Sequence, residues 1–314
     1  MQRTKVLVLN SRAYDYASLL KSQAPWIEPL PVEEHATVPS SELTQCKIWF
    51  GEPHIAAVLL QKGFKPEWLQ LTWAGINRLM PQELPKDYVL TRAVGVYGQV
   101  MAEYVLSYLL ANEQQHQYRR DEQSRFHWSP SKPGTLRGKN VLVVGAGSIG
   151  TEIARFIQPF GSRLVGVANH KRPIPPFEQV YTLSELPQAV AAADYIINVL
   201  PDTPGTRDIY SATLFEDVKR GAFFINIGRG PSVVDHDLIV AVESGQLSGA
   251  VLDVFRKEPL PQTHQFWNTK NIQATPHVAG PEIPELMVQM FLDNLSRFQS
   301  GEKLDGLVDF NAGY

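Results

Sequence analysis

Short apolar runs alternate with longer segments of helical periodicity along most of the chain. Within the short runs apolar residues follow one another directly, which is typical of strands covered on both faces. The longer segments place apolar residues three or four positions apart, which is typical of helices that cover such strands. The pattern predicts an α/β protein with parallel sheets. The expected strands are 6–9, 47–50, 69–73, 88–93, 141–144, 163–168, 195–200, 222–227, 250–254 and 272–275, and the expected helices are 14–21, 55–62, 101–120, 184–193, 235–244 and 282–299.

A polar segment, residues 121–139, follows the longest expected internal helix. Its Ser129-Pro-Ser-Lys-Pro-Gly134 stretch is typical of a connector between two units of structure. Phe126 and Trp128 are expected to anchor this connector against its neighbours. Taken in order, the chain would then have one doubly wound unit before about residue 100 and a second one after it.

A glycine-rich turn follows the apolar strand at 141–144. Gly145 suits a sharp turn, Gly147 lets a pyrophosphate approach the backbone, and Gly150 lets the next helix pack close to the strand. The free N–H groups of that helix would then face the phosphates. A glycine turn without a ligand is the alternative. The residues expected to bind a dinucleotide here are Gly145, Gly147, Ser148, Ile149 and Gly150.

The end of the next strand is expected to select the cofactor. An acidic residue there would bind a ribose 2′-hydroxyl and repel a 2′-phosphate. The sequence instead has Asn169, His170, Lys171 and Arg172, with no acid among them. These side chains predict a preference for NADPH, with NADH possible but less preferred. The alternative is that the two cations are solvated loop charges.

Four polar residues lie at or just beyond the carboxyl ends of strands, where parallel sheets bind ligands. His277 is either functional or a satisfied structural histidine, and Arg229 is either functional or a turn arginine between glycines. Glu258, taken alone, reads as an ordinary solvated carboxylate. Asp253 interrupts an apolar strand, so its carboxylate needs a partner or a ligand.

Composition narrows the class of protein further. The 314 residues are 44% hydrophobic and 19% charged, with a net charge of -3. This charge excludes a basic surface for nucleic acid or membrane lipid, and no apolar run reaches the length of a membrane span. The single cysteine, Cys46, excludes an internal disulfide and reads as a buried thiol. We therefore expect a cytoplasmic protein, and the sequence gives no reason to expect a bound metal.

Several motifs together resemble the D-isomer-specific 2-hydroxyacid dehydrogenase family. They appear in the family's order and cover nearly the whole chain, and the spacing near the C-terminus looks most like the glyoxylate/hydroxypyruvate reductase A branch. The stretches that carry the resemblance are Met101–Tyr104, Gly145–Gly150, Asn226–Gly230, Asp253–Pro261, Phe266-Trp267, Thr275–Ala279 and Gly313-Tyr314.

The resemblance implies a discontinuous fold. A Rossmann NAD(P)-binding domain, residues 101–284, would be inserted into a flavodoxin-like substrate domain made of residues 1–100 and 285–314. Members of the family are usually dimers with the active site in the cleft between domains. We therefore expect a homodimer that acts on a small molecule.

The resemblance also implies roles for individual residues. Arg229 would hold the substrate, His277 would exchange the proton, and Glu258 would stabilise the protonated imidazole. The cofactor would also contact Leu200, Pro201, Ile227, Gly228 and Asp253.

The family holds the substrate carboxylate with backbone amides in a turn after a strand. Ala74 and Gly75 match that turn, and Trp73 replaces a small polar residue in it. Trp73 would either narrow the pocket or be a core aromatic. By position, Trp49 and Trp267 are further candidates for the pocket.

The expected activity is NADPH-dependent reduction of glyoxylate or hydroxypyruvate. One alternative is an NAD-linked D-2-hydroxyacid dehydrogenase acting on a larger 2-oxo acid. The other is a non-catalytic protein that senses a dinucleotide.

Overall fold

The computed structural model describes residues 3–34 and 39–310. The chain divides into two compact units. Unit 1 contains the residues up to Val96 and those from Glu282 onward, and unit 2 contains Tyr97–Pro281. The terminal Gly313-Tyr314, which contributes to the family resemblance, lies outside the described residues.

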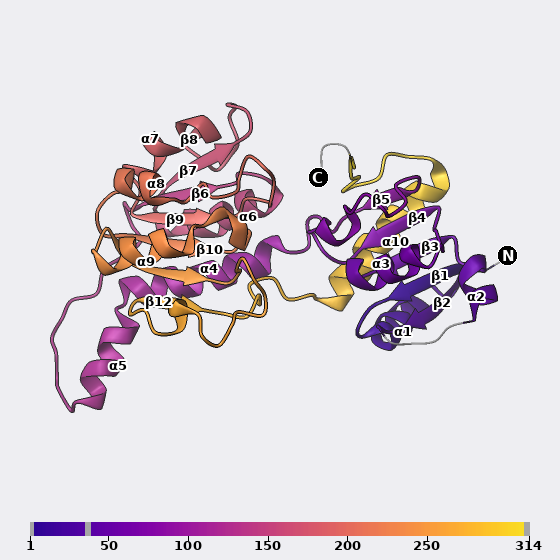
Figure 1. Ribbon diagram of the computed structural model, residues 1–314, viewed down its shortest axis with the longest axis horizontal. Helices are drawn as coiled ribbons and strands as arrows, with labels where there is room; N and C mark the ends of the chain where they lie inside the picture. Colours follow the sequence, from indigo (N-terminus) through magenta and orange to yellow (C-terminus); the bar gives the residue numbers. More distant parts are fainter. Residues whose placement is uncertain (1–2, 35–38, 311–314) are drawn as a thin grey trace. The chain divides into compact units, whose positions relative to one another are not determined.

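Unit 1 is a five-stranded parallel sheet with the order β2-β1-β3-β4-β5. This is the flavodoxin-like strand order. Helix α10, yellow in Figure 1, belongs to this unit although it follows the last of the unit's strands, β5, by nearly 200 residues. The strands are β1 (Thr4–Leu9), β2 (Ile27–Val32), β3 (Ile48–Gly51), β4 (Trp68–Leu71) and β5 (Val89–Thr91), and the helices are α1 (Ala13–Gln23), α2 (Ser40–Gln45), α3 (Pro53–Gln61) and α10 (Pro284–Ser300).

Neighbouring residues of β3 pack on opposite faces of this sheet, because side chains alternate along a strand. Phe50 stacks on Phe291 of α10 with ring centroids 4.5 Å apart. Trp49 packs in the other layer with Ile55 of α3, and its indole N–H donates to the carbonyl oxygen of Cys46. Trp49 has no exposed surface. The expectation that Trp49 lines the substrate pocket is therefore wrong, since this side chain belongs to the core.

Strand β2 has no counterpart among the sequence-based expectations. Its sequence, Ile27-Glu-Pro-Leu-Pro-Val32, contains two prolines, which normally argue against a strand. The strand tolerates them because it lies at the edge of the sheet, where one side of its backbone needs no partner.

Unit 2 is a seven-stranded parallel sheet with the order β12-β11-β10-β9-β6-β7-β8. Its first six strands in sequence have the Rossmann order, so the expected fold class is confirmed. The strands are β6 (Asn140–Val144), β7 (Arg163–Ala168), β8 (Gln179–Thr182), β9 (Tyr195–Asn198), β10 (Ala222–Asn226), β11 (Leu247–Leu252) and β12 (Ile272–Ala274), and the helices after β6 are α6 (Ser148–Ile157), α7 (Leu186–Val190), α8 (Ala212–Asp217) and α9 (Asp235–Glu243).

The helix expected at 101–120 is two helices, α4 (Gly98–Glu113) and α5 (His116–Ser124). Gln115 separates them with a left-handed backbone, at φ 55°. The connector that follows is also different from expectation. Phe126 is 100% exposed and Trp128 is 92% exposed, so neither side chain anchors it. Figure 1 shows α5 extending away from the sheet of unit 2.

No helix within 3–34 and 39–310 has the length and apolar character needed to cross a membrane.

Candidate functional site

The glycine turn after β6 has room for a pyrophosphate. Gly145 has a φ of +111°, which side chains disfavour, and a Cβ on Gly150 would lie 2.2 Å from the carbonyl oxygen of Gly145. A Cβ on Gly147 would meet nothing within 4 Å, so open space lies above this residue. Helix α6 begins at Ser148 without a side-chain cap, which leaves its first N–H groups for an anion. The turn therefore fits a dinucleotide.

This turn lies at the switch point of the sheet, where β6 pairs with both β7 and β9. The segments after β9 and β10 lie on the same edge and contain four of the expected cofactor residues. Leu200 and Ile227 are 7% and 3% exposed, so their side chains belong to the core and a ligand would meet their backbone. Gly228 packs against the backbone of Leu200, and Pro201 is exposed.

Two buried asparagines and a serine form a hydrogen-bond network at the carboxyl ends of β9 and β10. The amide of Asn198 donates to Asn226 Oδ1 and to Ser232 Oγ, both at 2.9 Å. Ser232 and Asn226 in turn donate to the carbonyl oxygen of Arg229. Sequence analysis missed this network. The available signal was that Asn198 and Asn226 each place a polar amide at the end of a buried apolar strand, where it needs a hydrogen-bond partner.

Arg229 follows β10 and is held in this network by its backbone. Among the described residues its guanidinium makes one hydrogen bond, from Nη1 to the carbonyl oxygen of Gly228 at 2.6 Å. Burial lowers the pKa of the Arg229 guanidinium, although the negative charges of Glu258 and Asp202 oppose this shift. The group nevertheless remains charged at neutral pH. A half-buried cation with unused donors is suited to bind an anion.

Glu258 and His277 form a hydrogen-bonded pair in the same unit. Nδ1 of His277 lies 2.8 Å from Oε2 of Glu258, and the N–H of Phe255 donates to Oε1 at 2.9 Å. Burial raises the pKa of Glu258, but the hydrogen bonds from His277 and Phe255 and the charge of Arg229 outweigh it and hold that pKa below its usual value. Glu258 is thus ionised at neutral pH and accepts a hydrogen bond from the Nδ1–H group of His277, which leaves Nε2 to exchange a proton with a ligand.

Asp253 has its partners within the protein. It is 1% exposed and accepts hydrogen bonds from Thr275 Oγ1 and from the backbone N–H groups of Val278 and Ala279, at 2.6 to 2.9 Å. Of the two alternatives left open by the sequence, the structure shows a partner. A contact between this carboxylate and the cofactor stays a prediction.

The loop after β7 contains the residues expected to select the cofactor. Asn169, His170, Lys171 and Arg172 are all exposed. Nζ of Lys171 forms an ion pair with Glu185 at 3.0 Å, whereas Arg172 has no ion pair within the part of the chain that the structure describes. Hydrogen bonds from the backbone and side chain of Thr182 and from Lys171 lower the pKa of Glu185. Sequence analysis did not identify this acid, which lies 14 residues from Lys171 along the chain.

The turn after β4 in unit 1 presents free backbone groups. Of the described residues, none accepts a hydrogen bond from the N–H of Ala74 or Gly75. Trp73 is 38% exposed, and its ring lies 5.5 Å from that of His54. Trp73 is therefore not a core aromatic, which was one of the two alternatives.

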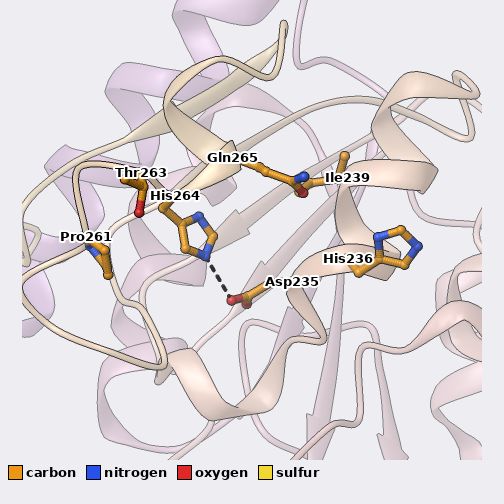
Figure 2. Close-up of a pocket in the computed structure, with 7 residues that line it drawn as sticks. All are labelled: Asp235, His236, Ile239, Pro261, Thr263, His264 and Gln265. Atoms are coloured by element: carbon orange, nitrogen blue, oxygen red, sulfur yellow. Dashed lines mark hydrogen bonds and ion pairs between the residues drawn. The ribbon is translucent and has the colours of Figure 1, made fainter.

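A surface pocket of unit 2 contains none of the expected site residues. His264 and Asp235 point toward each other across it, 3.2 Å apart, and this contact ties the loop after β11 to the start of α9 (Figure 2). The nearby Trp267 is 52% exposed and donates its indole N–H to Pro261. The pocket is lined by Asp235, His236, Ile239, Pro261, Thr263, His264 and Gln265.

Comparison with known proteins gives consistent matches. The family model described as D-isomer specific 2-hydroxyacid dehydrogenase, NAD binding domain, matches residues 106–279. A curated glyoxylate/hydroxypyruvate reductase A from Photorhabdus laumondii subsp. laumondii is 32% identical over 248 residues, which cover 77% of this chain and 79% of that protein.

Solved structures match over nearly the whole chain. A D-isomer specific 2-hydroxyacid dehydrogenase family protein from Aeromonas salmonicida subsp. salmonicida has a TM-score of 0.89 at 36% identity, over 99% of this chain and 100% of that one. An NADPH-dependent glyoxylate/hydroxypyruvate reductase from Sinorhizobium meliloti, solved with NADP and sulfate, has a TM-score of 0.89 at 26% identity, with the same coverage. The chain therefore belongs to the D-isomer specific 2-hydroxyacid dehydrogenase family of NAD(P)-dependent oxidoreductases.

Proposed function

We propose that this chain reduces small 2-oxo acids, glyoxylate or hydroxypyruvate, to 2-hydroxy acids with NADPH. The observation that carries the proposal is the Glu258–His277 pair, 2.8 Å apart, in the same unit as the partly satisfied cation of Arg229. An acid–base pair and an anion-binding cation are what the reduction of an anionic ketone or aldehyde requires. The names of the relatives from Photorhabdus and Sinorhizobium support this choice of substrate.

Each residue then has a distinct role. The hydride for the carbonyl carbon of the substrate would come from NADPH, which the glycine turn after β6 would hold. Arg229 binds the carboxylate and carbonyl oxygens with its planar fork of donors. His277 gives the proton on Nε2 to the carbonyl oxygen, and Glu258 stabilises the imidazolium before transfer. In the oxidative direction His277 takes that proton back.

We also propose that the turn after β4 contributes to substrate binding. The unused N–H groups of Ala74 and Gly75 would bind the carboxylate of the substrate. Trp73, with its exposed ring in the same turn, would narrow the space for the substrate side chain. This arrangement favours small 2-oxo acids over bulky ones.

The decisive experiment is an assay of the purified protein with glyoxylate, hydroxypyruvate, pyruvate and phenylpyruvate, each with NADPH and with NADH. We expect the highest kcat/KM for glyoxylate or hydroxypyruvate with NADPH. Higher efficiency with NADH and phenylpyruvate would establish the NAD-linked alternative. Tight binding of NADPH without turnover of any 2-oxo acid would establish the non-catalytic alternative.

The loop after β7 is expected to determine the cofactor preference through Arg172. Arg172→Ala should lower kcat/KM for NADPH by about tenfold or more, because a charge-assisted hydrogen bond contributes about 1.5–3 kcal/mol. The value for NADH should change little, since NADH has no 2′-phosphate. Lys171→Ala should have a smaller effect, because Glu185 already pairs with this lysine. The ratio of kcat/KM with NADPH to kcat/KM with NADH measures the cofactor preference of each variant. Lys303→Ala is the control. An equal loss for both cofactors would contradict the assignment.

We propose that the protein is a homodimer that uses the segment after α5. Phe126 and Trp128 place two almost fully exposed aromatic side chains within three residues, and aromatic side chains are enriched in protein interfaces. The double variant Phe126→Ser/Trp128→Ser should shift the protein toward monomer in sedimentation velocity. Tyr14→Ser, a control at an exposed position of α1, should not. A double variant with an unchanged sedimentation coefficient would exclude this segment from the interface.

A further inference from the structure

His277 has an unusual backbone conformation. Its φ is 54°, in the left-handed region that residues with a side chain rarely adopt. Such a conformation costs free energy and persists only where the surrounding structure enforces it. The N–H of His277 donates to the carbonyl oxygens of Asp253 and Thr275, at 2.9 and 3.0 Å, so the chain turns sharply at this residue.

The carboxylate of Asp253 holds the turn on both sides of His277. Before the histidine, Oγ1 of Thr275 donates to Oδ1 at 2.6 Å. After it, the N–H groups of Val278 and Ala279 donate to Oδ1 and Oδ2, at 2.8 and 2.9 Å. Because Asp253 is almost completely buried, water does not compete for these bonds.

A further hydrogen bond extends this network to helix α4. The hydroxyl oxygens of Tyr104 and Thr275 are 2.6 Å apart. Thr275 has one hydroxyl proton, which it donates to Oδ1 of Asp253, so Tyr104 must be the donor to Thr275. Burial raises the pKa of the Tyr104 phenol well above its usual value, which keeps the proton in place. The bonds thus run in one direction, from Tyr104 through Thr275 to Asp253.

We propose that Tyr104 and Thr275 are positioning residues that act, through Asp253, to hold His277 in its left-handed conformation and in contact with Glu258. This inference rests on the proposed role of His277 as proton donor. It assigns to α4 a function in catalysis that Tyr104 performs through Thr275 and Asp253. It also explains why an uncommon backbone conformation is retained at the histidine that pairs with Glu258.

The test removes the hydroxyl groups one at a time. Tyr104→Phe should lower kcat about 3- to 10-fold, as expected for the loss of one hydrogen bond. Thr275→Val should lower it about 10- to 100-fold, because it leaves Tyr104 and Asp253 both without their bond. Thr275→Ser, which keeps the hydroxyl, should retain most of the activity. KM for the 2-oxo acid and Kd for NADPH should stay within about twofold, since Arg229 and the glycine turn are intact.

A spectroscopic readout separates this proposal from the proposed function. The NMR signal of the His277 Nδ1 proton, hydrogen-bonded to Glu258, should shift or broaden in Thr275→Val and remain in Thr275→Ser and in the control Tyr14→Phe. This readout needs no turnover, so it holds even if the wild-type protein reduces no 2-oxo acid. An unchanged signal in both Tyr104→Phe and Thr275→Val, in folded protein, would overturn the proposal. Equal losses of kcat in Thr275→Ser and Thr275→Val would also overturn it.

Discussion

Replacing His277 with alanine is expected to lower kcat for 2-oxo acid reduction by about 10²–10⁴-fold, the usual contribution of a positioned acid–base group. No other proton donor is assigned to the carbonyl oxygen, so the loss should appear in kcat at saturating substrate. The fold should survive, because the His277 side chain is 53% exposed and, among the described residues, forms a hydrogen bond with Glu258 alone. Steady-state kinetics with NADPH would measure the effect.

The matched control is His236→Ala, which removes an imidazole from α9 in the same unit. It should leave kcat unchanged. The affinity for NADPH, measured by fluorescence titration, should be the same in both variants as in the wild-type protein. Reduction of glyoxylate by His277→Ala at the wild-type rate would refute the assignment of the proton donor.

Replacing Arg229 with lysine is expected to lower kcat/KM for the 2-oxo acid by about 10²–10³-fold, comparable to the loss of a transition-state hydrogen-bond donor. Lysine keeps the charge but lacks the planar fork that fits a carboxylate. The half-buried position makes the change more severe, because a shorter, strongly hydrated ammonium group would have to be placed there. KM should rise as well as kcat fall, since Arg229 binds the substrate before and during the reaction.

Arg163→Lys is the control for this substitution. Arg163 is an exposed arginine at the start of β7, so the same chemical change there should leave kcat/KM unchanged. Thermal unfolding of Arg229→Lys would show whether the fold is intact. A folded Arg229→Lys variant with wild-type kcat/KM would show that the guanidinium fork is not needed.

The fold was largely predictable because the sheets are buried on both faces. Uninterrupted apolar runs, such as 141–144 and 222–225, have no polar face to turn toward water. In an α/β protein they are therefore stable as strands that helices cover on both sides. The elements that were predicted wrongly are those in which the conformational preference of the local sequence differs from the conformation that the tertiary structure imposes. Pro29 and Pro31 argue against a strand, yet the edge position of β2 accommodates them. Gln115 carries no sequence signal for a break, yet its left-handed backbone divides one expected helix into two.

The candidate site was only partly predictable, for a similar reason. Arg229 and His277 could be identified as candidate site residues because each follows a strand. Glu258 was assigned its role only from the family resemblance. Side-chain burial was not visible in the sequence, so Trp49 was wrongly placed in the pocket and Trp128 was wrongly expected to anchor its connector. Contacts over long sequence distances, such as Tyr104 with Thr275, follow no local pattern at all.

The return of the chain to unit 1 has a consequence for synthesis on the ribosome. Phe291 of α10 stacks on both Phe50 and Trp68, so the aromatic layer of unit 1 is incomplete until the last part of the chain has emerged. Unit 2, by contrast, is one continuous segment, Tyr97–Pro281. Domains usually fold in the order in which they are made. Here the order is reversed: the dinucleotide-binding unit can complete its core first, and a nascent chain that stalls before α10 leaves the apolar face of the N-terminal sheet uncovered.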